Sequence, residues 1–256
     1  MILAFDVGNT NIVIGCIEND GKIRNTVRMR TEISATSAEY AIKILDMLSY
    51  MGVSPEDFEG AILSSVVPPV TGYLSQAVQK VIRSECMIVG PGVKTGMNVK
   101  IDDPGTLGAD LVVGGVAAIA FYGVPAIVID MGTATTITAV DKNRAFLGGA
   151  IIPGVKLSLA ALASGTSLLP DIYITRPDKA IGTNTVDCMR SGAVLGTASM
   201  IDGMIDRMER EIGEPCRIIA TGGLAPAVVP CCTHEIVCDD DLLLKGLWAI
   251  YRKNRK

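Results

Sequence analysis

The sequence predicts an α/β fold of two duplicated halves, residues 1–115 and 116–256, that face a shared cleft. An internal repeat is the first reason: residues 2–16 and residues 126–140 each read as an apolar strand, a polar tip with an Asp-x-Gly sequence, and a second apolar stretch. Composition is the second reason, because apolar residues make up 49% of the chain and aromatic residues only 4%, which is typical of buried strands flanked by helices. In each half the strands come first and the helices follow, which is the third reason.

After the first hairpin, the chain alternates between strands and helices. Residues 22–30 read as a third strand, and a helix is expected at 37–50, where Thr36 and Glu39 form a capping box. The later elements expected in the first half are a buried strand at 61–67, a helix that starts at Pro68 and a strand at 86–89.

A segment without charge, from Leu111 to Ile129, spans the boundary between the two halves. Glycines and Pro125 interrupt this segment, so a buried helix, a turn and a buried strand explain it better than a membrane span. The elements expected after the second hairpin are helices at 155–163 and 186–212, a strand at 217–220 and a helix at 240–252.

Charge and cysteine content exclude several classes of partner. The net charge is −4 with both signs spread along the chain, which offers no basic surface for nucleic acid or an anionic membrane. The N-terminus lacks a basic segment and meets an acid at once, so a cytoplasmic protein is expected. Seven irregularly spaced cysteines predict reduced thiols. The cluster Cys231, Cys232, His234 and Cys238 does not match the usual spacing of zinc ligands.

The two predicted hairpin tips could carry the chemistry. Asp6 aligns with Asp130, and Gly8 with Gly132, when the copies of the repeat are superposed. Backbone N–H groups and small hydroxyls at such tips suit a polyphosphate, carboxylates would hold the accompanying cations, and glycine lets the backbone approach the phosphate. One such tip would also fit an ordinary turn, but two copies predict nucleotide binding.

A third glycine signal is Gly222-Gly223, which follows the apolar residues 218–220. This turn could lie against a flat adenine ring, or it could simply connect a strand to a helix. Other nucleotide motifs are weak, because the chain has neither a G-x-x-x-x-G-K-[ST] sequence nor a G-x-G-x-x-G sequence after a strand.

Asp110 is the candidate general base. Phosphoryl transfer to a hydroxyl depends on positioning, charge stabilisation and a carboxylate near the acceptor. In residues 105–110, glycine and alanine leave room for a ligand beside this acid, although a favourable charge at a helix N-terminus is an alternative explanation. His234 is the only histidine, and without a nucleophile motif nearby it is expected to be structural or exposed.

Residues 6–10 and 130–136, in this order and separation, resemble the two phosphate motifs of type III pantothenate kinases, which belong to the actin, sugar kinase and Hsp70 ATPase superfamily. The resemblance implies two actin-like (ribonuclease H-like) halves with a nucleotide cleft between them. Further matching segments spread over nearly the whole chain, at 89–96, 107–110, 148–154, 182–185 with 191–192, 221–225 and 246–247.

The resemblance implies a phosphotransferase with an alcohol group as acceptor. Its reaction would be the ATP-dependent phosphorylation of pantothenate to 4′-phosphopantothenate, the first step of coenzyme A biosynthesis. The implied cofactors are ATP, Mg²⁺ and a monovalent cation, K⁺ or NH₄⁺. The implied partner is a second copy of the chain in a homodimer.

The resemblance also implies a role for each matching residue. Asp110 would be the general base, Asp130 would hold the monovalent cation, and Asp6 would hold magnesium directly or through a water molecule. The residues implied to bind ATP are Asp6, Val7, Gly8, Asn9, Thr10, Asn11, Ile12, Val13, Thr133, Gly222 and Gly223. The residues implied to contact pantothenate are Ile101, Leu107, Gly108, Ala109, Asp110, Leu111 and Thr185.

Two positions depart from the family pattern. Leu111 stands where the family has Arg directly after the base, and Ile101 stands where it has Tyr. Leucine supplies neither the charge nor the forked donors of arginine, although Lys94 or Lys100 could compensate. A pantothenate kinase with an altered acceptor pocket is the favoured hypothesis, because the phosphate motifs are complete. A catalytically inactive nucleotide-binding regulatory homologue and a kinase for another small hydroxylated acceptor stay open.

Overall fold

The computed structural model describes residues 1–255 and divides into two compact units. Unit 1 contains Met1–Gly96, Asp102–Ala120 and the chain from Asp241 onward, and unit 2 contains Met97–Ile101 and Phe121–Asp240. The C-terminal helix therefore belongs to the unit that the N-terminal sheet forms. The expected halves, 1–115 and 116–256, would meet inside helix α3 (Ala109–Phe121), and that division stays a prediction about the duplication.

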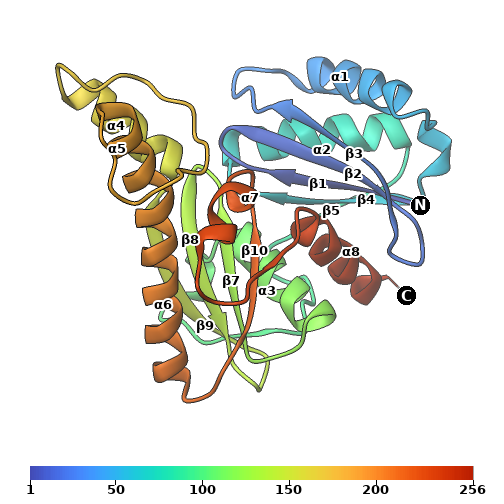
Figure 1. The fold of residues 1–256 in the computed structure, drawn as a ribbon. Coiled ribbons are helices and arrows are strands. Elements are labelled where there is room, and N and C mark those ends of the chain that lie inside the picture. The colour runs from blue at the N-terminus through green and yellow to red at the C-terminus, as the bar shows by residue number, and fades with distance from the viewer. Residues whose placement is uncertain (256) are drawn as a thin grey trace. The chain divides into compact units, whose positions relative to one another are not determined.

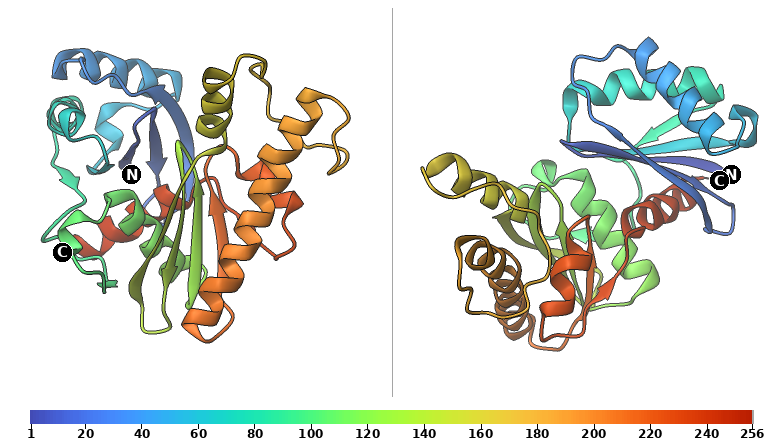
Figure 2. Two further views of the ribbon diagram at one scale, coloured as in Figure 1. Left: turned by 90° about the vertical axis from the view of Figure 1, so that its left-hand side faces the viewer. Right: turned by 45° about the horizontal axis from the view of Figure 1, so that its top comes forward.

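Unit 1 is a five-stranded sheet in the order β3-β2-β1-β4-β5. Strands β1 (Ile2–Val7), β2 (Asn11–Ile17) and β3 (Ile23–Arg30) are antiparallel, whereas β4 (Gly60–Ser65) and β5 (Cys86–Ile88) run parallel to β1. Helices α1 (Ser37–Tyr50) and α2 (Pro68–Ile82) cover one face (Figure 1), and α8 (Leu242–Asn254) packs on β1 and β4 from the other side (Figure 2).

The core of unit 1 follows from the alternation of side chains along β1. Leu3 and Phe5 join one apolar cluster with Tyr40 of α1 and Leu74 of α2. Ile2 is equally buried but lies outside that cluster, because successive strand residues point to opposite faces. A sheet covered on both faces needs apolar residues at every position of its central strand, which explains the continuous apolar run at the N-terminus.

Helix α8 packs closely on α3 at Gly246. A Cβ atom at this position would lie 2.8 Å from Val113 Cγ1 and would collide with the Val113 carbonyl oxygen. Only glycine therefore permits this approach of the two helices.

We expect Gly246→Ala to lower the free energy of unfolding by about 1–3 kcal/mol, because the added carbon overpacks the contact between α8 and α3. Gly72→Ala in α2 is the matched control: a Cβ there meets nothing within 4 Å, and alanine should stabilise the helix by about 1 kcal/mol. Urea denaturation of both variants measures these changes. Equal stabilisation by the two substitutions would contradict the close packing at Gly246.

Unit 2 is a six-stranded sheet in the order β11-β10-β7-β8-β9-β6. Strands β7 (Ala126–Met131), β8 (Ala134–Val140) and β9 (Ala145–Pro153) are antiparallel, β10 (Arg217–Thr221) and β11 (Val237–Cys238) run parallel to β7, and β6 (Asn98–Val99) pairs with β9. Helices α4 (Val155–Gly165), α6 (Thr197–Ile212) and α7 (Ala225–Val228) share one apolar cluster with β7, β8 and β10.

The two units repeat one topology, which confirms the predicted duplication. The order β9-β8-β7-β10-β11 reproduces the order β3-β2-β1-β4-β5, with the same parallel and antiparallel neighbours. Strands β1 and β7 have identical burial patterns residue by residue, and so do β2 and β8. Asp6 and Asp130 consequently occupy the same partly exposed position, after four buried residues of their strands.

Most of the expected elements are confirmed, and the charge-free segment forms α3 and β7. The helix expected at 186–212 is confirmed as one uninterrupted helical stretch, but it was not predicted to contain a π-helical turn. Helix α5 (Thr185–Ser191) passes into this turn at Gly192–Gly196, and α6 follows directly. Strand β9 was not predicted, since its two adjacent glycines interrupt the apolar alternation. Among the helices of residues 1–255, none is long and apolar enough to cross a membrane.

Candidate active site

The first hairpin tip joins β1 to β2 in unit 1. The Gly8 N–H donates to the Asn11 carbonyl oxygen over 3.0 Å, which leaves Asn9 and Thr10 exposed at the turn. Thr31, just after β3, anchors the tip: its hydroxyl donates to the Gly8 carbonyl oxygen (2.6 Å) and its N–H to the Thr10 carbonyl oxygen (3.0 Å). Sequence reasoning missed Thr31, because only the pairing of β3 with β2 brings it to the tip.

Two of the residues expected to bind ATP have no accessible side chain. Val7 is 1% exposed and Ile12 is 0% exposed, and both belong to the apolar cluster of unit 1. Any contact of these residues with a nucleotide is therefore restricted to their backbone atoms. The partly exposed Asp6, in contrast, lies one residue before the end of β1.

The second hairpin tip joins β7 to β8 in unit 2. The Gly132 N–H donates to the Ala134 carbonyl oxygen over 3.0 Å, and the exposed Thr133 lies between them. Gly154, which follows β9 and precedes α4, donates its N–H to the Thr133 carbonyl oxygen over 3.2 Å. A Cβ atom on Gly154 would lie 2.7 Å from the Gly132 carbonyl oxygen and would collide with that of Thr133. The shape of this tip therefore requires glycine at position 154.

The predicted glycine turn follows β10 and leads into α7. Gly222 has a φ of +94°, and a Cβ atom there would lie 2.6 Å from the carbonyl carbon of Met131. Close packing against the end of β7 thus accounts for Gly222, and Gly223 is the exposed residue of the pair. The structure places this turn and the second hairpin tip at the same end of adjacent parallel strands.

Asp110 lies in the first turn of α3, in unit 1. Its Oδ1 atom accepts the Leu111 N–H over 2.8 Å. Burial raises the pKa of the Asp110 carboxyl, and the hydrogen bond from Leu111 opposes part of this shift. A carboxylate with a raised pKa accepts a proton more readily, which suits a general base.

The two positions predicted to depart from the family pattern are partly buried. Leu111 follows Asp110 in α3, and Ile101 approaches β9 in unit 2, with its Cγ2 atom 3.8 Å from the Cβ position of Gly148. Lys100 forms an ion pair with Asp141 over 3.6 Å. The interaction with Asp141 argues against Lys100 as a replacement for the missing arginine.

Comparison with known proteins shows the family of the chain. The family model described as type III pantothenate kinase matches residues 2–207. The chain is 42% identical, over 254 residues, to a type III pantothenate kinase of Halalkalibacterium halodurans, and this alignment covers 99% of the chain and 100% of its relative.

The chain belongs to the type III pantothenate kinase family.

Two solved structures support the actin-like fold of this pantothenate kinase family member. (R)-2-hydroxyglutaryl-CoA dehydratase component A of Acidaminococcus fermentans is 15% identical, with a TM-score of 0.59 and coverage of 98% of this chain and 96% of that one. The activator of 2-hydroxyisocaproyl-CoA dehydratase from Clostridium difficile, solved with ADPNP, is 11% identical, with a TM-score of 0.55 and coverage of 100% and 98%. At this low identity, both comparisons concern the fold alone.

Thr185 is the first residue of α5 in the kinase and is distant in sequence from both hairpin tips. Asn184 caps this helix by accepting the Asp187 N–H over 2.9 Å, and Thr185 lines a mostly apolar cavity of about 820 Å³ between α4, α5 and the π-helical turn. This cavity lies within unit 2.

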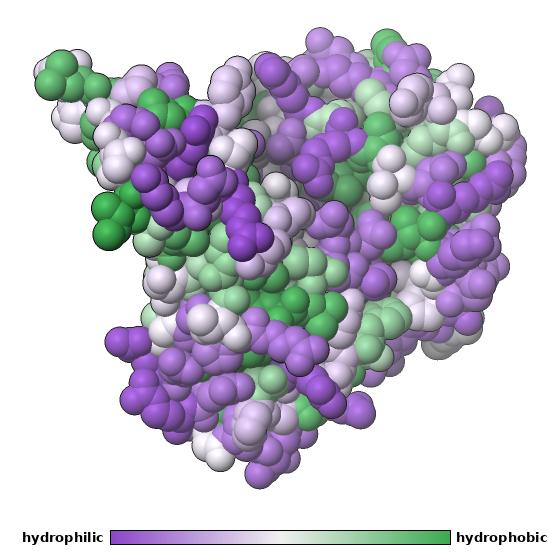
Figure 3. Space-filling view, in the orientation of Figure 1, coloured by the Kyte–Doolittle hydropathy of each residue, from purple (hydrophilic) through white to green (hydrophobic). Residues whose placement is uncertain are grey.

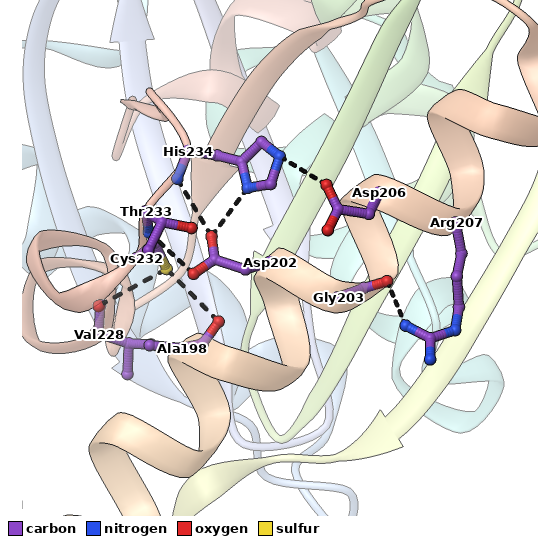
Figure 4. A network of polar contacts seen from close by, with 9 residues as sticks. All are labelled: Ala198, Asp202, Gly203, Asp206, Arg207, Val228, Cys232, Thr233 and His234. Atoms are coloured by element: carbon purple, nitrogen blue, oxygen red, sulfur yellow. Dashed lines mark hydrogen bonds and ion pairs between the residues drawn. The ribbon is translucent and has the colours of Figure 1, made fainter. Parts of the chain in front are cut away.

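His234 of the kinase bridges two acids of α6, as Figure 4 shows. Its Nδ1 atom lies 3.0 Å from Asp202 Oδ1, and its Nε2 atom lies 3.1 Å from Asp206 Oδ1. The hydrogen bond with Asp202 is the main reason that the pKa of His234 is raised, and hydrogen bonds from His234 and Thr233 hold the pKa of Asp202 low despite its burial. This network holds the segment after α7 on α6. No group of three or more His, Cys, Asp or Glu in residues 1–255 is arranged to hold a metal ion.

We expect this network to make stability dependent on pH. Because the folded pKa of His234 lies above its ordinary 6.5, its contribution is fully present below pH 6.5 and is lost as the pH rises through the folded pKa. Asp202 sets the lower limit of the pH range in which the network stabilises the fold. Because its pKa is lowered, its contribution to stability is present above about pH 3.8 and is lost in more acidic solution.

Urea denaturation at pH 5.5 and pH 9 tests this expectation. His234→Ala should lower the unfolding free energy by about 1 kcal/mol at pH 5.5 and by less at pH 9, since a partly exposed ion pair contributes modestly. Lys142→Ala, which removes an exposed ion pair with Glu214 without a histidine, is the control. An effect of His234→Ala that is the same at both pH values would refute the assignment.

Proposed function

We propose that this kinase transfers the γ-phosphoryl group of ATP to the primary alcohol of pantothenate, with Asp110 as the general base. The observation that carries the proposal is the partly buried Asp110 carboxylate with its raised pKa, in a chain that belongs to this family over most of its length. The base accepts the proton of the hydroxyl while the oxygen attacks the γ-phosphorus, and ADP leaves.

In this proposal, the two hairpin tips bind the polyphosphate. The first tip, residues Asp6 to Val13, supplies backbone N–H groups and the side chains of Asn9 and Thr10, and Thr133 supplies a second hydroxyl. These three residues are exposed, which, together with the anchoring of both turns, supports the assignment. Gly223, beside Gly222, offers a flat exposed backbone for adenosine.

Cations complete the proposed phosphate site. Asp6 holds Mg²⁺ directly or through water, and Asp130 holds K⁺ or NH₄⁺. Hard cations of this kind take oxygen ligands, and a single carboxylate with phosphate oxygens and waters is a usual magnesium site. The equivalent positions of the two carboxylates at the ends of β1 and β7 support paired roles.

The residues proposed to contact the acceptor are Ile101, Leu107, Gly108, Ala109, Leu111 and Thr185. Leu111 and Ile101 would bind pantothenate by apolar contact where the family uses a charge and a hydroxyl. Weak binding of the pantothenate carboxylate is the expected consequence, because one cation has been lost.

The kinase is further proposed to act as a homodimer in the cytoplasm. Several apolar side chains of unit 2 are exposed on β9, on α4 and in the segment that follows α4. They are Ile151, Leu157, Leu162, Leu168, Tyr173 and Ile181. Figure 3 shows green residues among purple ones at the upper left, where α4 and α5 lie in Figure 1. Burial of such a surface favours self-association. Light scattering should give a dimer that Leu168→Glu weakens and that Ile33→Glu, on the exposed surface of unit 1, leaves intact.

A coupled ADP-release assay tests the proposed reaction. ADP release should require pantothenate and Mg²⁺, and it should fall when K⁺ is replaced by an organic cation. Retained ATP binding without pantothenate-dependent release would instead favour a regulatory homologue. Release with a different small alcohol, and not with pantothenate, would identify another acceptor.

A further inference from the structure

Gly108 lies where the side chain of the proposed base needs space. A Cβ atom at this position would lie 2.5 Å from Asp110 Oδ1 and 3.6 Å from Asp110 Cγ, and the next atom, Val66 Cγ1, is 3.7 Å away. Carbon and oxygen atoms do not approach to 2.5 Å without a bond, so a side chain at position 108 would force the carboxylate to move. The backbone around Gly108 would not need to move, because the close contact involves only the Asp110 carboxylate.

The reason for this arrangement is the way α3 begins. The Gly108 carbonyl oxygen accepts the Val112 N–H over 3.2 Å, so Gly108 is the residue that caps the helix. A capping residue usually accepts the N–H of the third helical residue with its own side chain, and that residue here is Leu111. Gly108 has no side chain, and Asp110 Oδ1 accepts the Leu111 N–H instead.

We propose that Gly108 is a positioning residue for the base: the empty cap position of α3 lets the carboxylate of Asp110 cap the helix itself, and this hydrogen bond holds its orientation. Oδ1 is engaged by Leu111, so the other carboxylate oxygen is the one that takes the proton of the acceptor. This inference rests on the proposed role of Asp110.

The simpler alternative is that Gly108 only leaves room for pantothenate. The two roles predict different kinetics, because lost room weakens substrate binding, whereas a displaced base slows the chemical step even when the substrate is saturating. A measurement of thermal stability distinguishes both roles from damage to the fold. Serine is a better capping residue than glycine, so Gly108→Ser should not destabilise the protein.

The experiment compares Gly108→Ala and Gly108→Ser with the wild type. Each variant should keep its thermal midpoint and its ATP affinity, while kcat at saturating pantothenate should fall by about 10²-fold or more, because a misplaced catalytic group costs that much. Gly72→Ala in α2 of the same unit is the control, since a Cβ there meets nothing within 4 Å. An unchanged kcat with a raised KM for pantothenate would overturn the proposal.

An amide spectrum provides a readout that does not depend on activity. The Leu111 N–H resonance of the wild type should move with pH as Asp110 titrates, and this dependence should vanish in Asp110→Asn and in Gly108→Ala. A Leu111 resonance that ignores pH in the wild type would disprove the cap even if the glycine variants failed to fold. Absence of turnover in the wild type, or full turnover in Asp110→Asn, would instead count against the proposed function. The pH dependence of the Leu111 resonance would then still test whether Asp110 caps α3.

Discussion

Asp110→Asn is expected to lower kcat by about 10²–10⁴-fold while leaving the fold and the binding of ATP unchanged. Asparagine keeps an oxygen that can accept the Leu111 N–H, so the start of α3 should retain its geometry. It cannot take the proton of the acceptor hydroxyl, and the chemical step loses its base. The ADP-release assay at saturating ATP and pantothenate measures this loss.

The control for Asp110→Asn is Asp103→Asn. Asp103 is exposed and lies seven residues before Asp110 in the chain. Its side chain accepts the Gly105 N–H over 3.0 Å, so it is also a carboxylate that caps a turn. We expect this variant to keep kcat within about twofold, since surface changes away from a site have small effects. If Asp110→Asn kept more than a tenth of the wild-type kcat, another group would have to be the base.

The wild-type rate should also fall in acid. The base acts only when it is ionised, and burial raises the pKa of Asp110 above its ordinary 3.8. The value of kcat/KM should therefore decline at a higher pH than an exposed aspartate would give.

Gly154→Ala is expected to lower kcat/KM for ATP by about 10²-fold, because the second hairpin tip must move to admit the new methyl group. The Gly154 Cβ position is blocked by the carbonyl oxygens of Gly132 and Thr133, which are backbone atoms and cannot rotate away as a side chain could. Displacement of Thr133 removes a proposed phosphate contact. Steady-state kinetics with ATP as the varied substrate, together with a thermal midpoint, measures the effect.

Gly165→Ala is the matched control for Gly154→Ala. Gly165 ends α4 in the same unit, and a Cβ atom there meets nothing within 4 Å. Its kinetics should match the wild type. If Gly154→Ala bound and used ATP normally, the second tip would not need its present shape for catalysis, and the role proposed for Thr133 would fall with it.

The elements that sequence reasoning predicted well are those with a strong local pattern. Helix α1 begins where predicted, because Thr36 and Glu39 each accept the other's backbone N–H and form a capping box. Its end at Tyr50 also agrees with the prediction. The repeat predicted the matching positions of Asp6 and Asp130, since both strands use the same order of buried residues. The helix at 186–212 was predicted from its apolar periodicity, but the π-helical turn at Gly192–Gly196 within it was not, because periodicity alone does not distinguish the two kinds of helical turn.

The candidate site also has features that the sequence predicted and features that it did not. The two aspartates, the glycines of the tips and Asp110 were identified from local motifs and from a family resemblance that the comparisons confirm. The burial of Val7 and Ile12, the anchoring of the first tip by Thr31 and the ion pair of Lys100 with Asp141 were not predictable, because each depends on residues that lie far apart in the sequence.

The sequence by itself determined that the chain is a duplicated α/β protein of this kinase family, since strand periodicity, capping residues and short motifs are encoded within a few neighbouring residues. Tertiary structure decided that α8 joins the N-terminal sheet, that Gly154 shapes the second tip and that burial raises the pKa of Asp110. These properties arise from close packing and exclusion of water, which depend on contacts between distant segments that the order of residues along the chain does not display.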